Sequence, residues 1–125
     1  VHGTKIFMSY LTYETNQIVD SVLKGRFPEL FEAYVGENDP KDPLISPIFA
    51  TFASDFPPTV LTSGTRDLLL SSTVLLHRAL RRANVTAELH VFEAMTHGIF
   101  FNCPEEKELW NEQIKFMLRH MGKQK

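Results

Sequence analysis

The stretch Pro57–Phe100 opens with P-P-T-V-L-T-S-G-T-R-D-L-L-L and closes with A-E-L-H-V-F-E-A-M-T-H-G-I-F. Two short runs within it, Thr59–Ser63 and Ala87–Glu93, are apolar or β-branched and predict buried strands. The amphipathic run between them predicts a helix. A strand, helix, strand unit places its two strands parallel. This stretch therefore predicts an α/β fold.

The helix between the two strands has signals at both ends. Ser71 or Ser72 is expected to cap its N-terminus, and Asn84 is expected to stop it in the left-handed conformation. Its apolar face is predicted from helical spacing. That face consists of Val74, Leu75, Leu76, Ala79 and Leu80.

Asp67 follows the first predicted strand and His97 follows the second. Parallel strands end at the same edge of a sheet, where α/β proteins place their ligands, so the two side chains are expected to lie close together. A carboxylate can orient an imidazole and stabilise its protonated form when the imidazole takes a proton from a serine. Each residue alone would be read as a turn or loop residue. The pair at matching strand ends favours a catalytic role.

The chain resembles the C-terminal half of the hormone-sensitive-lipase-like carboxylesterases, a branch of the α/β-hydrolases. Besides the two motifs above, the resemblance rests on S-Y-L-T-Y-E-T-N-Q-I-V-D-S-V-L and D-P-K-D-P-L-I-S-P, and it runs from about Ser9 to about Phe101. It implies that Asp67 and His97 are catalytic. It also implies carboxylic ester hydrolysis by a Ser-His-Asp mechanism, with a small acyl ester as substrate.

Two signatures of that family are absent from the sequence, the H-G-G-G oxyanion loop and the G-x-S-x-G serine elbow. None of the seven serines has the flanking glycines that expose a nucleophile on a sharp turn. These serines are Ser9, Ser21, Ser46, Ser54, Ser63, Ser71 and Ser72. We therefore expect residues 1–125 to form a single domain, the C-terminal portion of an α/β-hydrolase domain, with the nucleophile outside this chain and the chain inactive by itself.

Such a partial fold would keep about three mostly parallel strands, with Lys5–Tyr10 as the third. Open strand edges favour pairing with other chains. The expected partners are a second copy, in a dimer or swapped assembly, or a chain that carries the missing half. The competing hypothesis is a catalytically silent α/β module or interaction domain.

The last helix is predicted from about Pro104 to about Met121. Proline suits its first turn, and acidic residues suit the positive end of its dipole. Helical spacing predicts one buried stripe. The stripe consists of Trp110, Ile114, Met117, Leu118 and Met121.

Composition excludes several other classes of protein. A net charge of -2 argues against a dedicated nucleic-acid binder, and the single cysteine, Cys103, excludes an internal disulfide. No apolar run is long enough to span a membrane, and no signal-peptide pattern is visible, which favours a cytoplasmic protein. The five histidines lack the spacing of zinc ligands, and Asp39 with Asp42 is a poor calcium pattern. No cofactor or metal is therefore expected.

Overall fold

The structure is a computed structural model of the 125-residue chain, and it describes residues 32–39, 41–97 and 102–121. The predicted strand Lys5–Tyr10 lies outside these residues. Both other predicted strands are confirmed, each within one residue of its expected end. They are β1, Thr59–Gly64, and β2, Ala87–Phe92, and they pair in parallel.

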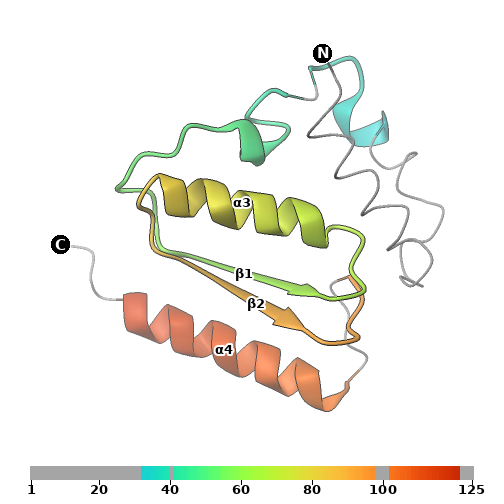
Figure 1. The fold of residues 1–125 in the computed structure, drawn as a ribbon, viewed down its shortest axis with the longest axis vertical. Coiled ribbons are helices and arrows are strands. Elements are labelled where there is room, and N and C mark those ends of the chain that lie inside the picture. The colour runs from blue at the N-terminus through green and yellow to red at the C-terminus, as the bar shows by residue number, and fades with distance from the viewer. Residues whose placement is uncertain (1–31, 40, 98–101, 122–125) are drawn as a thin grey trace.

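Two helices flank this strand pair on opposite sides (Figure 1). Helix α3, Leu70–Arg82, makes the crossover between β1 and β2, and helix α4, Pro104–His120, follows β2. A short 3₁₀ turn, η1, spans Pro47–Phe49. The chain therefore has the α/β architecture that the sequence predicts.

The centre of the core lies where α3 ends and β2 begins. Leu80, Val85 and Ala87 are buried together, with exposed fractions of 1%, 2% and 4%. Partly buried Phe52 and Leu61 pack against them. Asn84 joins the helix to the strand with φ of 60°, so the predicted left-handed stop is confirmed.

The start of α3 differs from the prediction. The helix begins at Leu70, ahead of Ser71 and Ser72, and no side chain at its N-cap position makes a capping hydrogen bond. The carboxylate of Asp67 instead accepts a hydrogen bond of 2.7 Å from the backbone N–H of Leu69. Asp67 thus forms the turn that leads into the helix, because an aspartate readily bonds the backbone two residues on.

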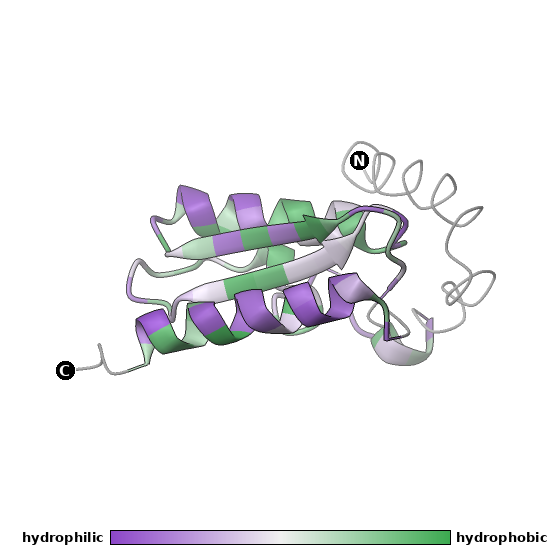
Figure 2. Ribbon diagram, turned by 90° about the horizontal axis from the view of Figure 1, so that it is seen from below, coloured by the Kyte–Doolittle hydropathy of each residue, from purple (hydrophilic) through white to green (hydrophobic). Residues whose placement is uncertain are grey.

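Parts of the two predicted apolar faces are exposed. On α3, Val74 and Leu75 are 38% and 37% exposed, and on α4 the buried helix residue is Phe116. All five residues predicted as the buried stripe of α4 are exposed, so that prediction is wrong for the residues described. They are Trp110, Ile114, Met117, Leu118 and Met121. Figure 2 shows hydrophobic and hydrophilic segments alternating along α4. Among the described residues, none of the helices is long and apolar enough to cross a membrane.

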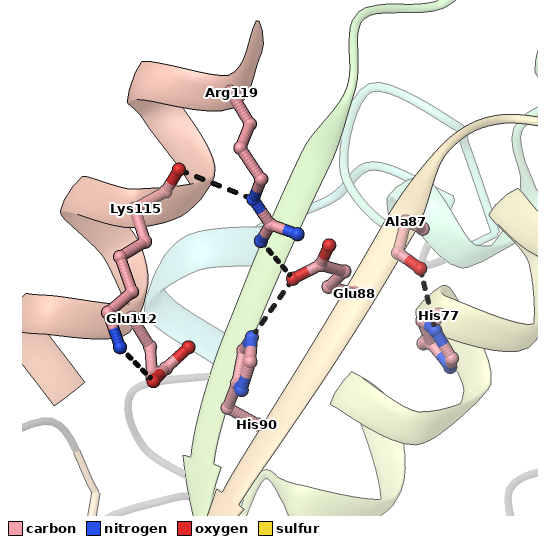
Figure 3. Close-up of polar contacts among 7 residues, drawn as sticks. All are labelled: His77, Ala87, Glu88, His90, Glu112, Lys115 and Arg119. Carbon is pink, nitrogen blue, oxygen red and sulfur yellow. Dashed lines mark hydrogen bonds and ion pairs between the residues drawn. The ribbon is translucent and has the colours of Figure 1, made fainter. Parts of the chain in front are cut away.

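An ion pair ties α4 to the start of β2 (Figure 3). Arg119 donates a hydrogen bond of 2.8 Å to the Glu88 carboxylate, and His90 lies 3.3 Å from the same oxygen. The hydrogen bond from Arg119 lowers the pKa of Glu88 below its ordinary value. The contact therefore stabilises the fold where Glu88 is ionised.

Replacing Arg119 with Met is expected to lower the free energy of unfolding by about 0.5 kcal/mol at pH 7, as for a partly exposed ion pair. Because folding lowers the pKa of Glu88, this stabilisation is present above the pKa of the unfolded carboxyl and is lost as the pH falls through the folded pKa. Urea unfolding at neutral and acidic pH measures the difference. Lys115→Met, which removes an exposed pair within one helix, is the comparison; a loss in Arg119→Met that is the same at both pH values would contradict the assigned role.

Candidate active site

The loops that follow β1 and β2 lie at the same end of the sheet, because the two strands run in the same direction (Figure 1). Gly64 stands opposite Phe92 where both strands end. Asp67 lies in the first loop and His97 in the second. This is the edge at which the sequence predicted a site.

Three hydrogen bonds hold the two loops together. The N–H of Thr65 donates to the carbonyl of Phe92 at 2.9 Å, and the N–H of Arg66 donates to the carbonyl of Met95 at 3.0 Å. In the opposite direction, the N–H of Ala94 in the second loop donates to the hydroxyl of Thr65 at 2.8 Å. These bonds fix the position of the second loop relative to the first.

Gly64 lets the two loops approach this closely. A Cβ atom at position 64 would lie 1.9 Å from the backbone oxygen of Met95 and 2.3 Å from its carbonyl carbon. Real Cβ atoms essentially never come so near another heavy atom. Position 64 therefore requires glycine for space, and the close contact belongs to the same junction that carries Asp67 and His97.

Asp67 is buried, with an exposed fraction of 3%. Its Oδ1 accepts the 2.7 Å hydrogen bond from Leu69 N–H, and its Oδ2 accepts one of 2.8 Å from the hydroxyl of Ser63. Burial of a carboxylate is tolerated when hydrogen bonds such as these satisfy its oxygens. The acid is therefore held from two directions by the chain on either side of it.

His97 completes the pair. Its Nδ1 lies 3.0 Å from Oδ1 of Asp67, so the predicted contact between the two side chains is confirmed. A carboxylate only accepts hydrogen bonds, so this contact assigns the ring proton to Nδ1. The imidazole is 40% exposed while the carboxylate is 4% exposed. A buried acid thus orients a base that reaches the surface.

This arrangement is the one that proton transfer from a hydroxyl requires. Nε2 can take the proton, and the Asp67 carboxylate stabilises the positive charge that develops on the ring. The catalytic roles of both residues stay predictions. Ser63 was not predicted to take part in the site, because a lone serine in a strand carries no motif. Its hydroxyl is buried and donates a hydrogen bond to the acid.

Two other histidines in the described part of the chain contact other groups. His77 lies 3.3 Å from the carbonyl of Ala87 at the start of β2, and His90 belongs to the contact with Glu88 (Figure 3). Asp39 and Asp42 each accept a backbone N–H two residues on and so act as turn formers. Within residues 32–39, 41–97 and 102–121, no group of three or more potential ligands is arranged to hold a metal ion.

The comparisons with known proteins agree with the fold. A family described as the alpha/beta hydrolase fold matches residues 8–101. A search of proteins with curated descriptions found no match.

Several solved structures share the fold. The crystal structure of the esterase E25 has a TM-score of 0.79 and 38% identity, over 87% of this chain and 35% of that one. An esterase from the bacterial hormone-sensitive lipase family has a TM-score of 0.78 and 28% identity, over 89% and 38%. A mutant of the esterase E40 has a TM-score of 0.78 and 29% identity, over 89% and 38%. The chain thus spans little more than a third of the length of each.

Proposed function

The chain belongs to the alpha/beta hydrolase family. From that premise we propose that it supplies the aspartate and the histidine of a Ser-His-Asp carboxylic ester hydrolase. The observation that carries the proposal is the 3.0 Å contact between His97 Nδ1 and the buried Asp67 carboxylate. Similarity to E25 and to a hormone-sensitive-lipase-family esterase favours ester substrates. The serine and the oxyanion donors are proposed to come from polypeptide outside this chain.

The reaction proceeds in two halves. His97 Nε2 takes the proton of the serine hydroxyl as its oxygen attacks the acyl carbon, and the imidazolium then gives that proton to the leaving alkoxide. Water attacks the acyl-serine with His97 again as the base, and the carboxylic acid leaves as the serine regains its proton. Asp67 keeps the ring in the Nδ1–H tautomer throughout and stabilises the imidazolium.

We expect the 125-residue chain alone to hydrolyse a p-nitrophenyl acyl ester no faster than buffer, because the sequence has no serine elbow. A chimera in which this chain replaces the matching third of the esterase E25 is expected to hydrolyse it. A chimera that folds but does not hydrolyse the ester would favour the hypothesis that the chain is an interaction domain. Turnover by the chain alone that disappears in a Ser→Ala variant would show that the nucleophile is within it.

The exposed apolar face of α4 is proposed to pack against the nucleophile-bearing part of the hydrolase domain. Trp110 and Met117 are 55% and 48% exposed, and Ile114 between them is 46% exposed. Apolar faces of this kind are typical of interaction sites. Almost two thirds of the E25 chain lies outside the part that this chain matches, so such a segment is available in a relative.

Without that segment the chain is expected to self-associate through the same face. Light scattering should show the mass rising with concentration, and the emission of Trp110, the single tryptophan, should move to shorter wavelength in parallel. Ile114→Glu should abolish both changes, whereas Lys107→Glu on the same helix should not. A wild-type chain that stays monomeric at tens of micromolar would contradict the proposal.

A further inference from the structure

The two oxygens of the Asp67 carboxylate have different partners. Oδ2 accepts the hydrogen bond of 2.8 Å from Ser63, while Oδ1 accepts from Leu69 N–H at 2.7 Å and lies 3.0 Å from His97 Nδ1. The hydroxyl of Ser63 thus bonds one oxygen of the carboxylate, and the 3.0 Å contact with His97 is made by the other.

Ser63 is well placed to hold that side. It belongs to β1, it is 4% exposed, and it stands opposite Val91 in the sheet, so its backbone is fixed by strand pairing. Asp67 lies beyond the strand end, in the turn that leads into α3. The Ser63 hydroxyl is therefore attached to strand backbone, which is more rigid than the loop backbone that carries the Asp67 carboxylate.

A carboxylate needs such support. Rotation about its last torsion is broad and roughly two-fold, so backbone geometry alone does not determine the plane of the carboxylate that faces the imidazole. A donor on each oxygen sets the plane of the group, and burial strengthens both hydrogen bonds. With Oδ2 held by Ser63, the carboxylate presents Oδ1 to His97.

We propose that Ser63 is a positioning residue for the Asp67–His97 pair: its hydroxyl fixes the plane of the carboxylate and thereby keeps His97 in the Nδ1–H tautomer. Its consequence for catalysis rests on the proposed ester hydrolase function. The effect on the tautomer does not rest on that function, because it concerns the Asp67–His97 pair without substrate.

Nitrogen-15 NMR of the histidine-labelled chain measures the ratio of the two neutral tautomers of His97. We expect Ser63→Ala to lower the Nδ1–H to Nε2–H ratio by on the order of five-fold, the size of one lost hydrogen bond. Ser63→Cys keeps the shape of the side chain, with a somewhat larger γ atom, but carries only a weak donor, so it should lower the ratio in the same direction. The Cys variant decides the matter if the Ala variant fails to fold, as judged from its amide spectrum.

Thr62→Val is the matched control. Thr62 is the neighbour of Ser63 on β1, and its hydroxyl accepts a hydrogen bond of 3.3 Å from Gln113 of α4. Removing that hydroxyl costs the strand one side-chain hydrogen bond but leaves the carboxylate untouched, so the tautomer ratio should not change. A ratio equal to wild type in both Ser63 variants, or one lowered equally in Thr62→Val, would overturn the proposal.

The E25 chimera provides the catalytic measurement. Ser63→Ala is expected to lower kcat several-fold and leave KM unchanged, because the hydroxyl acts on the base and not on the substrate. An unchanged kcat in Ser63→Ala would overturn the catalytic part of the proposal. A chimera that is inactive with the wild-type chain would instead count against the proposed function, while the tautomer ratio would still test the positioning role.

Discussion

Replacing His97 with Gln in the E25 chimera should reduce ester hydrolysis by about 10⁴- to 10⁶-fold. The amide cannot take the proton of the serine hydroxyl, so the nucleophile stays neutral and unreactive at pH 7. What survives is the contribution of substrate binding and of the oxyanion donors. The measurement is kcat/KM with a p-nitrophenyl acyl ester.

Asp67→Asn is expected to reduce kcat by about 10⁴-fold in the same assay, since an amide in place of the carboxylate favours the wrong histidine tautomer. The loss of activity in Asp67→Asn and the loss in His97→Gln should not add in the double variant, because the two residues act as one unit. His77→Gln is the matched control. It is the same substitution, but His77 contacts the carbonyl of Ala87 at the other end of β2. Activity that falls equally in the control would point to a general loss of folding.

Gly64→Ala should have the largest effect on stability, with a loss of about 3 kcal/mol in the free energy of unfolding. The added methyl group would lie 1.9 Å from the backbone oxygen of Met95. A side chain could relieve such a clash by changing its rotamer, but a backbone carbonyl cannot. The loop that carries His97 would have to move away from β1. Urea unfolding followed by circular dichroism gives the free energy.

Gly36→Ala provides the comparison for that experiment. Gly36 has φ of 55° and ends the helical turn at residues 32–35, but no atom lies within 4 Å of the place a Cβ would take. Its cost is therefore backbone strain alone, about 1 kcal/mol. Equal losses at the two positions would contradict the account of the Gly64 contact.

The sequence predicts the framework of the site because the framework depends on local patterns. The run that forms β1 lies between Pro58 and Gly64, and the run that forms β2 follows the left-handed stop at Asn84, so local signals set where both strands start. Parallel strands then bring Asp67 and His97 to one edge of the sheet, where the structure places the two side chains in hydrogen-bond contact. These steps need no knowledge of distant packing.

Other features depend on contacts that no local pattern records. The start of α3 follows a turn in which the Asp67 carboxylate accepts the N–H of Leu69, and neither Ser71 nor Ser72 lies at the N-cap position. Helical spacing identifies the apolar stripe of α4 correctly as a stripe. Spacing cannot show whether other described residues pack against this stripe, and Trp110 and Met117 are in fact exposed. The hydroxyl of Ser63 also becomes meaningful only when the fold places it against Asp67.

The central claim is that His97, held by Asp67, activates a serine nucleophile that lies outside this chain. A fluorescent alkyl phosphonate ester tests it most directly, because such reagents bond covalently to an activated serine. In the E25 chimera, mass spectrometry should find one phosphonate on the serine of the E25 portion, and the labelling rate should fall at least about 10³-fold in His97→Gln. Labelling of the His97→Gln chimera at the wild-type rate would contradict the claim.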